Sequence, residues 1–363
     1  MITPALRDND APDERRTESY KQKPLQFMIC GPLAQIYGSF PTPISMNIIL
    51  LLVGLCLLVA GASFLVDGAS SIARKAGISE FVIGLTMVGF GTSCPELVVS
   101  LNGAIQGNSE IAIGNVIGSN IFNILLILGI TALIAPVQMT RESRRKDIPI
   151  MLIVSVLLIV CGMGSMIFGG EGPGYVSRPE ALLFLAIFAS YLIHSFRTGK
   201  ASAEEECEGQ KNMKLPVAII LVITGLAGLI FGGNLLVNSA TQLARQLGVS
   251  DKLIAFTVLA GGTSLPELAA SVTAALKGKH QLALGNIVGS NIFNILFILG
   301  CSGLITPLSF ASITYIDVVA MLVSGLMLFL WAFTGRKDRI DRWEGIVMLL
   351  AYGVYCYFLF NRL

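Results

Sequence analysis

Charged residues are scarce in this chain of 363 residues, because Asp, Glu, Lys and Arg together make up only 13% of it. A typical soluble domain carries roughly 25%, so an ordinary water-soluble fold is excluded. Hydrophobic residues reach 54% and recur in runs long enough to cross a hydrocarbon core about 30 Å thick. The net charge of +2 gives no sign of a nucleic-acid partner. The composition therefore predicts a protein embedded in the lipid bilayer.

Nitrogen and sulfur side chains that bind metals are also few. The chain has two histidines, His194 and His280, and seven cysteines that form no CxxC pair and lie mostly inside apolar runs. Thiols in such runs usually act as small hydrophobic side chains. We therefore expect neither a metal site built from imidazole or thiolate nor a bound cofactor.

Ten apolar segments are predicted to cross the membrane as helices, because only helices and closed barrels satisfy their backbone groups in lipid. The segments are 47–67, 81–105, 111–134, 148–168, 180–196, 216–238, 252–276, 282–305, 314–333 and 343–361. The loops after the odd-numbered segments hold sixteen Lys and Arg, against four in the loops after the even-numbered segments and the C-terminus. The positive-inside rule then predicts a multi-pass inner (plasma) membrane protein with a cytoplasmic central loop and an external C-terminus.

The first 45 residues match none of these segments. They are charged, then weakly apolar and interrupted by Gly and Pro, and they lack the basic start and cleavage site of a signal peptide. We expect the tail 1–45 to be poorly ordered, or the functional protein to begin near Met46. The rest of the chain divides into 46–197, a polar and acidic cytoplasmic linker at 198–213, and 214–363.

The two large parts repeat each other at an offset of 171 residues. GNVIGSNIFNILLILG (114–129) matches GNIVGSNIFNILFILG (285–300) at thirteen of sixteen positions, and GTSCPELVVS (91–100) matches GTSLPELAAS (262–271). Each part holds five predicted helices, and an odd number forces the second part to enter the membrane upside down. Inverted repeats are a transporter architecture. The predicted fold is thus all-α, with ten transmembrane helices in two inverted five-helix repeats.

Two glutamates lie near the middle of predicted helices, Glu96 in the second segment and its repeat mate Glu267 in the seventh. An acid at the bilayer centre costs ~2.5–3.5 kcal/mol on insertion scales, so it marks a functional site. Pairing with Lys or Arg is the competing explanation, but neither occurs in the central part of any segment. Pro95 and Pro266 directly precede the acids and predict a break in each helix, which frees carbonyl oxygens beside the carboxylates.

Polar side chains of the longer repeated motif form a stripe, because their spacing of four residues places them on one helix face. The stripe is Asn115, Ser119 and Asn123 in the first copy and Asn286, Ser290 and Asn294 in the second. Such stripes can simply join helices. Beside two buried acids, we interpret them as oxygen ligands for a hard cation such as Ca²⁺ or Na⁺. Asn120, one residue past Ser119, is expected to point away from this site.

The motifs GTSxPE and GSNIxN, each present twice, resemble those of the sodium/calcium exchanger family of cation/Ca²⁺ antiporters in its compact prokaryotic form, over about residues 46–361. The resemblance implies alternating access by sliding of the first and sixth helices past the core, with Ca²⁺ and a monovalent counter-cation as the transported ions. It implies ten cation ligands, namely Thr92, Ser93, Glu96, Ser119, Asn123, Thr263, Ser264, Glu267, Ser290 and Asn294. In well-known members the position of Asn294 is an Asp, so this chain departs from the pattern there.

Exchange of Ca²⁺ for Na⁺ is the function predicted first, and a Ca²⁺/H⁺ or other cation/proton exchange on the same scaffold is the alternative. We expect a transporter and not an enzyme. An intramembrane enzyme would use two acids that share a proton, and the Thr, Ser and Asn stripes would then have no role. A channel would not require inverted repeats around a closed midplane site.

Overall fold

Almost every element of the structure is a helix. The computed structural model describes residues 43–167, 174–202, 213–249, 260–334 and 339–362. The first half contains α4 (Ile44–Ala76), α5 (Glu80–Ile83), η1 (Gly84–Val88), α6 (Gly89–Thr92), α7 (Cys94–Ile105), α8 (Ser109–Ile121), η2 (Phe122–Leu128), α9 (Gly129–Ile134), β1 (Val137–Gln138), η3 (Ser143–Asp147), α10 (Ile148–Ile167), β2 (Tyr175–Val176) and α11 (Arg178–Ser202). The second half contains α12 (Leu215–Gln246), α14 (Ala260–Gly262), α15 (Leu265–Leu276), α16 (His280–Phe293), η6 (Asn294–Ile298), α17 (Leu299–Ile305), β3 (Leu308–Ser309), α18 (Tyr315–Thr334), β4 (Arg339–Ile340) and α19 (Arg342–Arg362). The segments marked η are π-helical turns within longer helices.

Eight helices are long and apolar enough to cross a membrane, and a bent pair, Glu80–Thr92 with Cys94–Ile105, makes a ninth span if it is counted as one. These nine correspond to nine of the ten predicted segments. The predicted segment 252–276 falls partly on 250–259, outside the described residues, and the rest of it is the short helix α15. The described residues therefore support eight or nine spans, and the predicted count of ten is not reached. The predicted tail and most of the predicted linker also lie outside the described residues.

Two spans form the centre of the fold. The span made of α16, η6 and α17 is 94% buried, and the span made of α8, η2 and α9 is 72% buried. These are the two spans that carry the repeated motif, and their apolar side chains dominate the larger hydrophobic core. The spans of α4 and α12 are only 28% buried, and their outward faces carry exposed Ile, Leu and Val. An exposed apolar face of this kind is what a lipid environment requires.

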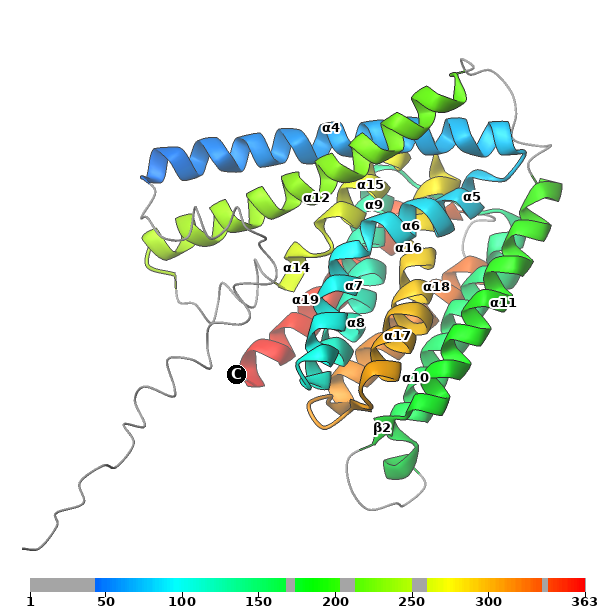
Figure 1. Ribbon diagram of the computed structural model, residues 1–363, viewed down its shortest axis with the longest axis vertical. Coiled ribbons are helices and arrows are strands. Elements are labelled where there is room, and N and C mark those ends of the chain that lie inside the picture. The colour runs from blue at the N-terminus through cyan, green and yellow to red at the C-terminus, as the bar shows by residue number, and fades with distance from the viewer. Residues whose placement is uncertain (1–42, 168–173, 203–212, 250–259, 335–338, 363) are drawn as a thin grey trace, which may run out of the picture. The chain divides into compact units, whose positions relative to one another are not determined.

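The two longest helices, α4 and α12, lie side by side and cross the direction of α10 and α11 (Figure 1). Glycines at every seventh position form their contact: Gly54 and Gly61 on α4 face Gly232 and Gly225 on α12. A Cβ atom at Gly61 would come within 2.8 Å of the Gly225 carbonyl oxygen, and one at Gly54 within 2.9 Å of the Gly232 oxygen. The helices run antiparallel, because the lower-numbered glycine of one faces the higher-numbered glycine of the other. Small residues therefore bring the two backbones into direct contact.

Two very short antiparallel sheets join the halves at the ends of the spans. In one, β1 pairs with β4 and Val137 lies opposite Ile340; in the other, β2 pairs with β3 and Val176 lies opposite Leu308. Each sheet takes one strand from each half. The halves are thus connected through backbone hydrogen bonds as well as through side-chain packing.

Candidate cation site

Each half interrupts a helix at a serine that stands just before its proline and glutamate. Ser93 separates α6 from α7 with φ −82° and ψ 8°, and the two parts of that span are bent by 51°. Ser264 precedes α15 with nearly the same angles, φ −91° and ψ 8°. A proline then lies in the first turn of the new helix, where its missing N–H is tolerated. The predicted break is thus present in both halves, and it puts Glu96 and Glu267 in the first turns of α7 and α15.

The two glutamates are bound by serines of the opposite halves. Ser264 donates from Oγ to Oε1 of Glu96 at 2.8 Å, and Ser93 donates from Oγ to Oε1 of Glu267 at 2.9 Å. All four side chains are at most 1% exposed. The two Glu-Ser pairs are equivalent at an offset of 171 residues, and they bring four predicted site residues together at the contact between the halves.

Each glutamate keeps one carboxylate oxygen without a hydrogen-bond partner. Oε2 of Glu96 and Oε2 of Glu267 are both buried and unpaired. A buried acceptor left in this state costs free energy, so such atoms are rare outside sites that bind a ligand. The two oxygens are the first candidates for cation ligands.

Ser119 and Ser290 extend the same network. The Oγ atoms of Ser290 and Ser93 are 3.1 Å apart, and those of Ser119 and Ser264 are 3.4 Å apart. Both stripe serines are buried. The structure therefore places these predicted ligands beside the serines that contact the carboxylates.

Asn115 and Asn286, the first residues of the two stripes, act on the backbone. Asn115 donates from Nδ2 to the carbonyl of Glu96 at 3.1 Å, and Asn286 donates to the carbonyl of Glu267 at 3.3 Å. The same amide groups also donate to a serine one turn further along α7 and α15. These contacts tie α8 to α7 and α16 to α15, so this part of the stripe joins helices and supports the glutamates from behind.

Four asparagines of the repeated motif pair across the halves. Asn123 donates from Nδ2 to Oδ1 of Asn291, and Asn294 donates from Nδ2 to Oδ1 of Asn120, both at 3.0 Å. Asn120 in turn donates to the carbonyl of Asn291 at 3.3 Å. The expectation that Asn120 points away from the site is therefore wrong. Its side chain is 1% exposed and contacts a predicted ligand.

This pairing decides which end of each amide is available. A backbone carbonyl only accepts hydrogen bonds, so Asn120 must present Nδ2 to the carbonyl of Asn291 and Oδ1 to Asn294. Asn294 can then offer only Nδ2 to Asn120. The Oδ1 atoms of Asn294 and Asn123 are left buried and without a partner, which makes them the second pair of candidate ligand oxygens.

Both of these asparagines lie in π-helical turns. Asn123 is the second residue of η2, and Asn294 is the first residue of η6. A π-helical turn inside an α-helix changes the direction of the following side chains and is frequent at functional sites. The local widening therefore coincides with the residues whose oxygens are unpaired.

Thr92 and Thr263 are the least engaged of the predicted ligands. Thr92 is fully buried and donates from Oγ1 to the carbonyl of Val88 at 3.0 Å, so its hydroxyl proton serves its own helix. Thr263 is partly exposed and lies between α14 and α15. Either residue would contribute an oxygen as an acceptor, from the hydroxyl or from the main chain.

The site as a whole offers oxygen atoms and two negative charges. Within the described ranges, no three side chains of the His, Cys, Asp and Glu types come together as a metal-binding group. Two carboxylates with neutral hydroxyl and amide oxygens suit a hard cation such as Ca²⁺, which takes six to eight oxygens, or Na⁺. The residues that sequence reasoning missed are Asn120 and Asn291. Their signal was present in the motif GSN, which occurs in both halves at the same offset.

Comparison with known proteins gives a consistent result over most of the chain. The family model described as "Sodium/calcium exchanger protein" matches residues 46–197 and 217–361. The "Putative antiporter CaxA" of Alkalimonas amylolytica is 40% identical over 322 residues, which cover 86% of this chain and 98% of the relative. The "Sodium/calcium exchanger MaX1" of Methanosarcina acetivorans is 36% identical over 349 residues, 87% of this chain and 99% of the relative.

A solved structure shares the fold. The sodium-calcium exchanger NCX_Mj, soaked with 2.5 mM Na⁺ and 0.1 mM Ca²⁺, superposes with a TM-score of 0.72 at 33% sequence identity. The match covers 85% of this chain and 97% of that chain.

Proposed function

Because the chain belongs to the sodium/calcium exchanger family, whose members carry out cation/Ca²⁺ antiport, we propose that it exchanges Ca²⁺ for Na⁺ across the membrane. The observation that supports this best is the symmetric pair Glu96 and Glu267. Each glutamate is bound through one oxygen by the other half and keeps its second oxygen buried and unpaired. Two negative charges at one place balance one Ca²⁺ or two Na⁺, so a single site can serve both ions in turn.

We propose ten residues as the site. The ligand set is Thr92, Ser93, Glu96, Ser119, Asn123, Thr263, Ser264, Glu267, Ser290 and Asn294. The unpaired oxygens assign the leading roles to the two glutamates and to the amides of Asn123 and Asn294. The serine hydroxyls stabilise the carboxylates when no cation is bound and can turn their lone pairs to a cation that displaces those bonds.

Na⁺ is the proposed counter-ion. The GTSxPE form of the motif resembles the sodium-coupled branch, and the relative MaX1 carries the description of a sodium/calcium exchanger. With Asn at both 123 and 294, the cluster at the centre holds only two acids. Proton coupling on the same scaffold would require one of these glutamates to exchange H⁺ for Ca²⁺, which is the competing mechanism.

Alternating access is proposed to rest on two inverted five-helix repeats with ten membrane crossings. Equivalent hydrogen bonds at an offset of 171 residues support the repeat, and the antiparallel contact of α4 with α12, the first helices of the two halves, supports the inversion. We propose that these two helices slide together past the central spans and open the site to one side at a time. The basic loops place the central loop in the cytoplasm and the C-terminus outside.

A flux assay tests the proposal directly. Purified protein in proteoliposomes loaded with ⁴⁵Ca²⁺ should release the isotope when Na⁺ is added outside, and not when choline replaces it. Release driven by a pH jump and indifferent to Na⁺ would favour the proton-coupled alternative. Absence of release under every cation gradient, with folded protein, would contradict antiport at this site.

A further inference from the structure

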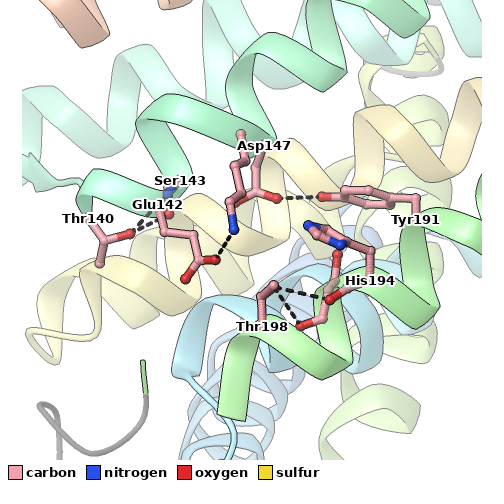
Figure 2. A network of polar contacts seen from close by, with 9 residues as sticks. Thr140, Glu142, Ser143, Asp147, Tyr191, His194 and Thr198 are labelled. Carbon is pink, nitrogen blue, oxygen red and sulfur yellow. Dashed lines mark hydrogen bonds and ion pairs between the residues drawn. The ribbon is translucent and has the colours of Figure 1, made fainter. Parts of the chain in front are cut away.

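A second polar cavity lies where α5, the segment η3 and the end of α11 meet, and it contains none of the residues of the carboxylate site. Its volume is about 20 Å³, which is room for one particle of the size of a water molecule. The residues that decide its chemistry are Asp147, Ser195, Glu142, Lys146 and His194. Figure 2 shows Tyr191 of α11 pointing toward Asp147, with His194 beside it.

Asp147 is buried at the bottom of this network. Its side chain is 7% exposed, and its Oδ1 accepts a hydrogen bond of 3.0 Å from the Tyr191 hydroxyl (Figure 2). A related pair occurs in the second half, where Tyr355 donates to Oδ1 of Asp317 at 2.9 Å. The two aspartates therefore share their tyrosine contact and can be compared directly.

The second oxygen is where the two aspartates differ. Oδ2 of Asp317 accepts from both the N–H and the hydroxyl of Thr314, at 3.0 and 2.6 Å. In the first half the corresponding turn is closed on itself, because Thr140 accepts from the N–H of Ser143 and the two hydroxyls lie 2.9 Å apart. Among the side chains that the structure describes, none donates to Oδ2 of Asp147. A buried carboxylate oxygen is thus left for a ligand.

Ser195 provides an independent indication of a ligand. It lines the same cavity, its side chain is 5% exposed, and its Oγ is buried without a hydrogen-bond partner. A buried hydroxyl is almost always paired with protein or with a bound particle. The cavity therefore combines an unpaired hydroxyl with an underused carboxylate.

The charge of the lining selects the kind of ligand. Lys146 forms an ion pair with Glu142 at 2.8 Å, so these two charges offset each other. With His194 neutral, Asp147 leaves a net charge of −1. No group of three side chains that could hold a metal ion occurs anywhere in the described parts of the chain. One negative charge with hydroxyl oxygens suits a monovalent cation better than a divalent one.

We propose that this cavity binds one monovalent cation of the size of Na⁺, held by the Asp147 carboxylate and the Ser195 hydroxyl. The cation would connect η3 and α11 with Phe81 and Val82 of α5, which form another wall of the cavity. Because α5 begins the broken span that carries Glu96, the bound cation stabilises the support of the transport site without being transported. Ca²⁺ does not compete for this site.

The test uses full-length protein carrying Glu96→Gln and Glu267→Gln, so that the transport site is disabled. Thermal unfolding is measured in detergent with NaCl or choline chloride at equal ionic strength. Binding to the folded state raises the midpoint, and we expect Na⁺ to raise it by about 2 °C or more. Adding Asp147→Asn should remove this rise, and Ser195→Ala should increase the Na⁺ concentration needed severalfold. Asp317→Asn is the matched control and should keep the rise.

Three outcomes would overturn the proposal. They are the absence of a Na⁺-specific rise in the background protein, a rise that survives Asp147→Asn, and an unchanged Na⁺ requirement in Ser195→Ala. The serine variant keeps the test decisive if Asp147→Asn fails to fold. None of these outcomes bears on exchange at Glu96 and Glu267, because that site is already disabled.

Discussion

Asn120 and Asn294 lie in opposite halves of the protein and are joined by a hydrogen bond of 3.0 Å whose direction is determined by a third group. Asn120 gives its amide N–H to the carbonyl of Asn291, so only its oxygen faces Asn294, and Asn294 must answer with its own N–H. The unpaired oxygen of Asn294 is thereby directed away from Asn120. A residue that binds no cation itself thus determines which atom its partner offers to the cation.

Asn120→Ala should weaken Ca²⁺ binding while leaving both glutamates intact. The variant removes an acceptor and a donor from a buried network, at about 1–3 kcal/mol, and lets the Asn294 amide rotate. We expect the Ca²⁺ concentration for half-maximal exchange to rise severalfold, measured by ⁴⁵Ca²⁺ flux. Asn291→Ala, the repeat mate, should behave similarly. Lower stability with unchanged Ca²⁺ affinity would mean that these residues only hold the helices together.

Asn294→Asp should make exchange depend more strongly on pH. An ionised carboxylate at 294 would face the Oδ1 of Asn120 and lie in the same cluster as two other acids, and these charges repel one another in a poorly solvated site. One acid therefore keeps a proton when no Ca²⁺ is bound, and that proton must leave before Ca²⁺ binds. Ca²⁺ affinity should fall as pH falls, more steeply than in the wild type. Identical pH profiles of ⁴⁵Ca²⁺ uptake would place Asn294 outside the ligand shell.

Glu96→Gln and Glu267→Gln should each abolish Ca²⁺ exchange without unfolding the protein. Each variant halves the negative charge that balances a divalent cation, while the amide can still accept a hydrogen bond from the serine of the other half. Flux should drop to the level of empty liposomes, with normal expression and a single peak in size-exclusion chromatography. Glu110→Gln is the control, because this glutamate is exposed in the first turn of α8. Robust exchange by either site variant would refute the assignment.

Gly61→Ala should destabilise the protein by about 1–3 kcal/mol, because its Cβ would press on the backbone of α12 at Gly225 and Leu229. The expected readout is a lower midpoint of thermal unfolding in detergent, together with slower exchange if α4 and α12 move as a pair. Gly353→Ala, on α19, meets no described atom within 4 Å and should leave the midpoint unchanged. A harmless Gly61→Ala would mean that the contact between the two helices is looser than the structure indicates.

The orientation follows from the distribution of basic residues and has its own test. Single cysteines placed in the linker 198–213 should react with a membrane-impermeant reagent only after the cells are opened, whereas a cysteine added at the C-terminus should react in intact cells. The natural cysteines would first be replaced by serine or alanine. A C-terminus that is protected in intact cells and reactive in opened ones would reverse the topology.

Much of the site could be predicted from residue types alone. Acids, prolines and glycines in apolar segments each carry a strong physical penalty, so their presence pointed to the break at Ser93 and to Glu96 and Glu267. Asn120 was misjudged for a physical reason. An offset of one residue turns a side chain about 100° around an isolated helix, which suggests a separate face, but α8 and α16 lie in spans that are 72% and 94% buried. Most directions from such helices point at another helix.

The lengths of α4 and α12 also escaped prediction. Hydropathy marked only the stretches 47–67 and 216–238, whereas the helices continue to Ala76 and Gln246. Their ends carry more polar residues and are held by packing between helices, which a one-dimensional hydropathy pattern does not contain. The glycine contact between them depends on two segments far apart in the sequence, and it became visible only in three dimensions.

The crossed bonds between Ser93 and Glu267 and between Ser264 and Glu96 have a consequence for the order of synthesis. The ribosome completes the first five spans before it makes residue 264, so Glu96 reaches the membrane while its serine partner does not yet exist. The first half then holds an acid without its hydrogen bond and a strand, β1, without β4. Assembly of the site is therefore a late step of biogenesis, and a chain truncated after α11 would expose an unsatisfied carboxylate to whatever quality control the membrane provides.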